Sequence, residues 1–144
     1  MKWKYNDGGR KNAGFKGKAN DCVCRAICIA GQLDYTTVYN RLNEAGAKER
    51  TSKRRAGKSN ARTGVHISTI RKFLANLGWV WVPTMGIGTG CKVHLRDGEL
   101  PRGRLIVNLS KHTAAVINGV IFDTDDPSRD GTRCVYGYWY KPAA

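Results

Sequence analysis

The chain has 144 residues, of which 41% are hydrophobic and 9% aromatic, a composition that is typical of folded globular proteins and excludes a disordered one. No stretch reaches the ~18 apolar residues of a membrane span, and the N-terminus has no apolar core of signal-peptide length, so we expect a cytoplasmic protein without a membrane partner. The formal charge of +14 favours a polyanionic partner, usually nucleic acid, although high charge also keeps a small protein soluble.

Chain length and cysteine content predict one domain with reduced thiols. A chain of this length suits a single core of ordinary size, so we expect one domain over residues 1–144. The five cysteines are odd in number and irregularly spaced, which is not the pattern of a disulfide framework. We therefore expect free thiols in a reducing compartment.

The N-terminal segment is expected to be irregular, because its glycines break any helix and its lysines keep it solvated. Only Met1–Tyr5 is predicted to add a strand, at the edge of a sheet.

The stretch Asn20–Ala30 predicts a buried helix with a thiol in its first turn. The helix is expected to begin at about Asp21, with Asn20 or Asp21 as its cap, and to end at Gly31. Cys22 lies where unpaired N–H groups and the positive end of the helix dipole favour a thiolate over a thiol. This is the position of a cysteine nucleophile, but a buried cysteine also serves simply as a small hydrophobe, and both interpretations remain open.

A second helix is predicted from Asp34, a good cap, to Ala45, with Gly46 as its stop. The following segment, residues 48–62, holds seven Lys or Arg against one Glu and has no hydrophobic period, so we expect a flexible, exposed basic loop. It has no aromatic residue on which bases stack, which favours non-specific phosphate contact over sequence reading, or no ligand at all. The candidate nucleic-acid contacts are Lys53, Arg54, Arg55, Lys58 and Arg62.

The rest of the chain changes from helix to strand. A third helix is expected at about Val65–Leu77, followed by a strand at Trp79–Pro83. The Gly-rich run at 85–90 lacks the spacing of a phosphate or dinucleotide loop, so we expect a flexible loop and no cofactor. Further strands are predicted at 104–109, 112–117, 120–124 and 133–140. Helices first and strands afterwards predict an α+β fold, with N-terminal helices packed on a C-terminal antiparallel sheet.

The hairpin around Asn118-Gly119 brings a histidine and a carboxylate together. A two-residue turn pairs Ile117 with Val120, which places His112 opposite Asp125 and diagonal to Asp123, all on one face of the sheet. Either carboxylate is expected to accept the imidazole N–H and fix the tautomer of a general base. Asp123 is the better candidate because it directly follows an apolar run. His66 and His94 have no same-face carboxylate in prospect.

Asp21-Cys22 at the start of a helix, with His112 and Asp123 late in the chain, resembles the pattern of papain-like cysteine peptidases. The similarity is greatest to the compact bacteriocin-processing type, in which an Asp-Cys pair opens the helix and a His and an Asp complete the triad. Asn20–Val23 with Arg25–Ile27 also looks like a group of small uncharacterised phage proteins with that fold. The resemblance implies a papain-like hydrolase of peptide, isopeptide or side-chain amide bonds, located in the host cytoplasm if phage-encoded. It assigns Cys22 as nucleophile, His112 as base and acid, and Asp123 as orienting group.

One position departs from the peptidase pattern. The peptidases carry a glutamine about six residues before the nucleophile, where it helps to stabilise the oxyanion, and Lys16 occupies that place here. The nearest amide side chain is that of Asn20. Because the loss of one oxyanion donor costs ~100-fold or more in rate, weak activity, different chemistry and no activity all remain open.

Several alternatives remain beside the hydrolase. Cys24 is a rival nucleophile, but two residues along a helix turn it about 200° away from Cys22, so that Cys24 and Cys28 are expected to pack inward. A zinc site is a weaker hypothesis, built from Cys22, Cys24, Cys91, His94 and Cys134. A non-catalytic protein on a degenerate peptidase scaffold, binding nucleic acid or a host protein, is the main alternative to an enzyme.

Overall fold

The fold is α+β, as predicted, in a computed structural model that describes residues 1–50 and 57–143. The described residues form three helices: α1 (Cys22–Gly31), α2 (Tyr35–Ala47) and α3 (Ile67–Asn76). The strands are β1 (Lys2–Tyr5), β2 (Val80–Pro83), β3 (Arg104–Leu109), β4 (His112–Ile117), β5 (Val120–Asp123) and β6 (Val135–Tyr140). Among the described residues, no helix is long and apolar enough to cross a membrane.

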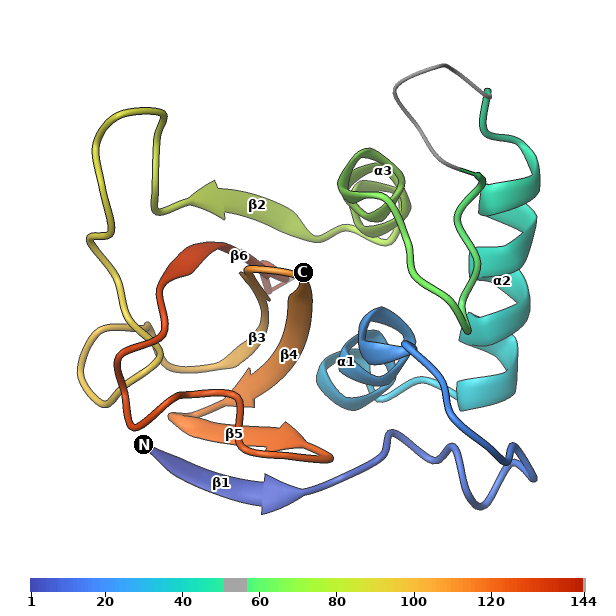
Figure 1. Cartoon of the computed structure of the whole chain (residues 1–144), viewed down its shortest axis with the longest axis horizontal. Coiled ribbons are helices and arrows are strands. Elements are labelled where there is room, and N and C mark those ends of the chain that lie inside the picture. The colour runs from blue at the N-terminus through green and yellow to red at the C-terminus, as the bar shows by residue number, and fades with distance from the viewer. Residues whose placement is uncertain (51–56, 144) are drawn as a thin grey trace.

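The six strands form one sheet in the order β1-β5-β4-β3-β6-β2. The expectation of an antiparallel sheet was wrong at one edge, because β1 pairs with β5 in parallel and makes the sheet mixed. The N-terminal strand β1 lies beside β5, the last strand of the β3–β4–β5 meander, and runs in the same direction (Figure 1). The strand predicted at 79–83 also joins the sheet, at its other edge.

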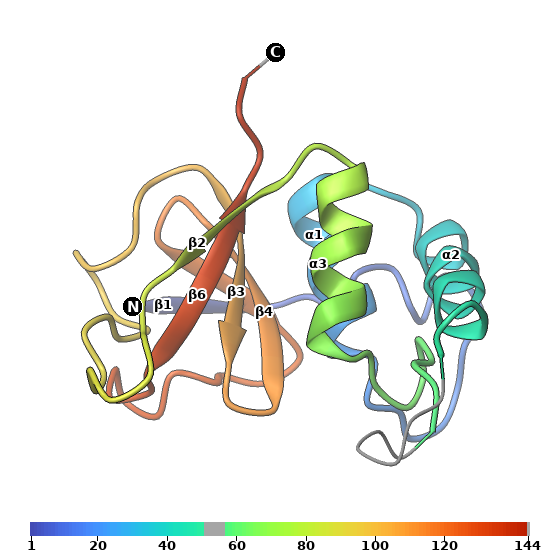
Figure 2. The same ribbon diagram turned by 90° about the horizontal axis from the view of Figure 1, so that it is seen from above.

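The sheet separates two hydrophobic clusters. One cluster lies between the helices and the sheet, with Ile27 of α1 against Ile106 and Ala115 of β3 and β4. The other lies on the opposite face and includes Val107 and Val116. The strands curl around this face of the sheet (Figure 1). Figure 2 shows the helices on one side of the molecule and the strands on the other. Their junction is the contact of α1 with β3 and β4.

Part of the predicted basic loop is built into the fold. Ser59 and Ala61 are buried, and the Glu49 carboxylate accepts hydrogen bonds from the Ser59 N–H at 2.5 Å and from the hydroxyls of Ser59 and Thr69. Glu49 thereby fastens residues 57–62 between α2 and α3. The expectation of an exposed loop was wrong for this part of the segment, because a single acidic residue among many basic ones supplies the anchor.

Gly46 does not stop α2 but lies inside it. The helix continues one residue further, and the missing side chain of Gly46 leaves room for the backbone of Ser59. Its predicted cap is confirmed, because the Asp34 carboxylate accepts the Thr37 N–H at 3.0 Å.

Cys91 and Cys134 form a disulfide, so the expectation of reduced thiols was wrong for this pair. The two residues are separated by 43 positions, and no local spacing in the sequence predicts that they pair. Backbone hydrogen bonds between residues 93–95 and 133–135 bring their segments together. Cys22, Cys24 and Cys28 are free.

Candidate active site

Cys22 is the first residue of α1 and is half-buried. Asp21 holds the N-cap position, but its side chain does not cap the helix, contrary to expectation. It is instead directed into the protein, where the Tyr35 hydroxyl donates to it at 2.6 Å. The first N–H groups of the helix therefore remain available beside the Cys22 thiol.

His112 is the first residue of β4, and Asp123 is the last residue of β5. The predicted register is confirmed, because Ile117 pairs with Val120 across the turn. The imidazole Nε2 lies 2.6 Å from Asp123 Oδ2, which leaves Nδ1 for the thiol. Asp123 is only 4% exposed, whereas Asp125 is exposed and has no contact with the imidazole among the described residues.

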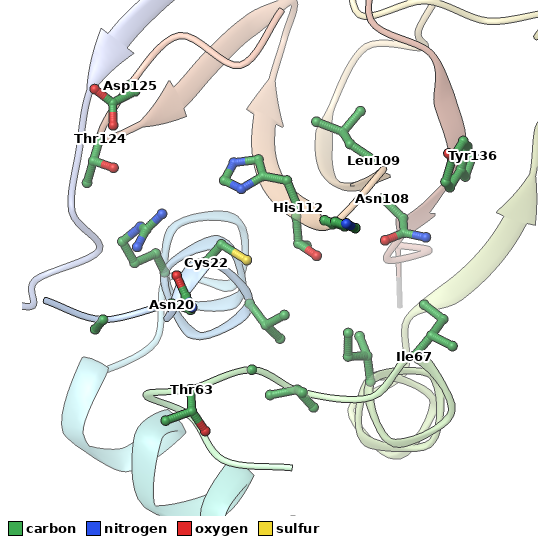
Figure 3. A pocket seen from close by; sticks show the side chains of 18 residues that line it. Asn20, Cys22, Thr63, Ile67, Asn108, Leu109, His112, Thr124, Asp125 and Tyr136 are labelled. Atoms are coloured by element: carbon green, nitrogen blue, oxygen red, sulfur yellow. The ribbon is translucent and has the colours of Figure 1, made fainter. Parts of the chain in front are cut away.

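The structure brings Cys22 and His112 together from opposite halves of the molecule (Figure 3). Burial raises the pKa of the Cys22 thiol, but its hydrogen bond with His112 and the imidazole charge outweigh burial and bring the pKa below its ordinary 9.0. Burial likewise lowers the pKa of His112, yet the hydrogen bonds to Asp123 and Cys22 raise it from 6.5 to about 9. These opposite shifts favour a thiolate beside an imidazolium at neutral pH.

A cavity of about 740 Å³ opens at the thiol. Cys22, His112 and Asn20 line it, together with the half-buried Asn108 of β3. The rest of its wall is mixed. Apolar side chains come from α1, α3, the segment before α3 and two strands: Val23, Val65, Ile67, Ile70, Leu109 and Tyr136. Polar and charged side chains complete it: Arg25, Thr63, Lys111, Thr113, Thr124 and Asp125. Lys16 does not line the cavity, whereas the side-chain amides of Asn20 and Asn108 do.

A buried ion-pair network adjoins Cys22 and His112, and it was not predicted from the sequence. Arg25 of α1 contacts the carboxylates of Asp21 and Asp123, the latter at 3.3 Å. Arg10 reaches Asp21 at 3.4 Å. The spacing of Asp21 and Arg25 at i, i+4 on a helix was a readable signal for their contact, but nothing local signals the contact with Asp123.

The other candidate ligands and nucleophiles lie elsewhere. Cys24 is fully buried and its Sγ lies 3.8 Å from the Tyr35 carbonyl, so the prediction that it packs inward is confirmed. The hydrogen bond with Cys28 and burial raise the pKa of Cys24. His94 contacts Glu99, and His66 contacts the Gly57 carbonyl. Within residues 1–50 and 57–143, no three His, Cys, Asp or Glu side chains gather as a metal site, and the disulfide removes two of the suggested zinc ligands.

The predicted nucleic-acid contacts divide into two groups. Lys53, Arg54 and Arg55 lie outside the described residues. Lys58 is exposed, although its ammonium donates to the Ala47 carbonyl at 3.0 Å. Arg62 is half-buried and its guanidinium donates to the carbonyls of Lys16 and Lys18, so it holds the N-terminal segment in place.

Comparison of the chain with protein-family models, with curated proteins and with solved structures finds no match.

Proposed function

We propose that the chain is a papain-like cysteine hydrolase that cleaves a peptide, isopeptide or side-chain amide bond at Cys22. The observation that carries the proposal is the His112–Asp123 contact of 2.6 Å beside a thiol at a helix N-terminus. This arrangement supplies a nucleophile, a base beside it and a group that orients the base, which are the three parts that thiol catalysis uses. The resemblance to papain-like peptidases rests on the same three residues and supports the same assignment.

The reaction follows from these positions. The Cys22 thiolate attacks the amide carbon, a C–S bond forms, and the carbonyl oxygen takes the negative charge. The His112 imidazolium then gives its proton to the amide nitrogen as the C–N bond breaks, which releases the amine and leaves a thioester. His112, now neutral, takes a proton from water, and the hydroxide attacks the thioester to release the acid and the thiolate.

Asp123 keeps the imidazole oriented through Nε2 in both steps. The oxyanion would be met by the free N–H of Cys22 and by the side-chain amide of Asn20 at the cavity wall. The apolar side chains of Val65, Ile67 and Ile70 offer contacts to a hydrophobic side chain of the substrate, whereas Lys111 and Asp125 offer charged contacts in the same cavity.

The test is the pH dependence of alkylation of each thiol by iodoacetamide, followed by mass spectrometry in the wild type and in His112→Ala. In the wild type, Cys22 is expected to react fast well below pH 9.0, because the imidazolium stabilises its thiolate. In His112→Ala, the midpoint is expected to move up to that of an ordinary thiol. Amide hydrolysis should decline above about pH 9, as His112 loses the proton that the leaving amine needs.

Cys24 and Cys28 serve as internal controls, because both are buried and should react only after unfolding. If Cys22 reacts as an ordinary thiol in the wild type, the hydrolase proposal fails, and a non-catalytic binder on this fold takes its place.

Nucleic-acid binding is the second candidate function, favoured by the charge of +14. The structure reduces the set of candidate nucleic-acid contacts, because the Arg62 guanidinium already donates to the protein's own backbone carbonyls. Exposed Lys58 and the cluster of Lys53, Arg54 and Arg55 remain as its candidate contacts.

A further inference from the structure

Arg25 connects the two carboxylates that flank the thiol and imidazole. Its side chain is 11% exposed and follows Cys22 by one helical turn. One arm of the guanidinium contacts Asp21 Oδ1, and the other lies 3.3 Å from Asp123 Oδ1. Both carboxylates are buried, with side-chain exposures of 2% for Asp21 and 5% for Asp123.

The contacts of Asp123 divide between its two oxygens. Oδ2 meets the imidazole of His112, whereas Oδ1 accepts the Thr124 N–H at 2.7 Å and the guanidinium of Arg25. A carboxylate held at Oδ1 from two sides cannot rotate freely, so Oδ2 stays directed at Nε2. Arg25 thus acts on the imidazole through Asp123.

Charge gives Arg25 a second effect. A thiolate at Cys22 forms next to the buried carboxylate of Asp21 and near that of Asp123, and like charges in a poorly solvated site disfavour it. The charged groups around the thiol come from several elements. His112, Arg25 and Arg133 act on it directly, and Lys111 and Asp125 line the same cavity. Asp21 and Asp123 are linked to it through Arg25 and His112. Among the described residues, Arg25 is the one cation in contact with both carboxylates.

We propose that Arg25 is a positioning residue of the thiol site, which holds Asp123 against His112 and offsets the charge of Asp21, so that Cys22 and His112 coexist as an ion pair. The inference rests on the proposed function, since it concerns the same thiol. It also explains why a planar guanidinium stands there, because one ammonium cannot contact two separated carboxylates with parallel arms.

The experiment measures the pH profile of Cys22 alkylation in Arg25→Met, Arg25→Lys and Tyr35→Phe. Arg25→Met removes the charge and both contacts, and we expect the alkylation midpoint to rise by about one pH unit, which lowers the rate at pH 6 about tenfold. Arg25→Lys keeps the charge but not both contacts, so a smaller loss of about threefold is expected. Tyr35→Phe removes the hydrogen bond to Asp21 from the other side and should leave the profile unchanged.

The outcomes separate the inference from the proposed function. An ordinary thiol profile in the wild type overturns both. If the wild-type midpoint is low and Arg25→Met does not change it, the role of Arg25 is overturned but the proposed function is not. The role of Arg25 is also overturned if Tyr35→Phe shifts the midpoint as much as Arg25→Met does. Circular dichroism checks folding, and if Arg25→Met does not fold, a wild-type profile in Arg25→Lys overturns the inference.

Discussion

Gly46 illustrates how a single residue depends on its tertiary setting. In an isolated helix, alanine is favoured over glycine by ~1 kcal/mol. Here, a Cβ at position 46 would lie 1.9 Å from the Ser59 carbonyl oxygen, and Glu49 holds Ser59 in place. We therefore expect Gly46→Ala to destabilise the protein by about 1–3 kcal/mol, the cost of overpacking. Urea unfolding measures it.

The matched control is Gly86→Ala, where the added Cβ would lie 3.5 Å from the Thr89 hydroxyl, an ordinary contact. Its unfolding midpoint should stay near that of the wild type. A Gly46→Ala variant as stable as this control would mean that the approach of Ser59 to α2 is looser than the structure shows.

Local pattern predicted much of the candidate site at the residue scale. The two-residue turn fixes the register, and the register alone places Asp123 diagonal to His112. Arg25 was missed because its contact with Asp123 joins residues 98 positions apart, and such a contact leaves no trace in either local stretch. The helix was expected to begin at about Asp21 and begins one residue later, at Cys22. The capping role given to Asp21 was wrong because tertiary partners compete for its carboxylate.

At the scale of elements, the disulfide ties the segment before β3 to the start of β6. Cross-linking residues 43 positions apart removes conformations from the unfolded chain, with an expected stabilisation of about 3–5 kcal/mol. We expect the paired change Cys91→Ser and Cys134→Ser to lower the free energy of unfolding by that amount in urea titrations. Reducing agent should bring the wild type to the same midpoint, and a wild type that reducing agent leaves unaffected would argue against the bond.

Residues 57–62 show why the loop prediction failed in part. The segment is mostly polar or basic, and its single apolar side chain, Ala61, sets no period, so hydrophobic periodicity gives no signal of burial. Ser59 is held by hydrogen bonds to Glu49, and the buried Ala61 donates its N–H to the Asn43 side chain at 2.8 Å, contacts that sequence patterns do not encode. This matters for the site, because residues 63–65 directly after it form one wall of the cavity.

At the scale of the whole molecule, the net charge of +14 predicts retention on heparin that weakens steeply with salt. If the basic segment is the binding site, changing Lys53, Arg54 and Arg55 to alanine should abolish retention at physiological salt. The control changes the exposed residues Lys72, Lys92 and Lys141 and removes the same charge elsewhere. Equal losses in both variants would attribute the binding to overall charge and end the case for a localised site.

The division of the molecule into a helical half and a sheet half has a consequence for how the site forms during synthesis and folding. Cys22 and Arg25 belong to the helical half, whereas His112 and Asp123 belong to the sheet half. In the proposed mechanism His112 activates the thiol, so we expect Cys22 to react as an ordinary thiol in a growing chain until the β4–β5 hairpin has been made and α1 has packed against it. If Cys22 is the nucleophile, we expect it to be unreactive during synthesis and to become reactive only when the helices have packed on the sheet, so that thiol reactivity would measure completed folding.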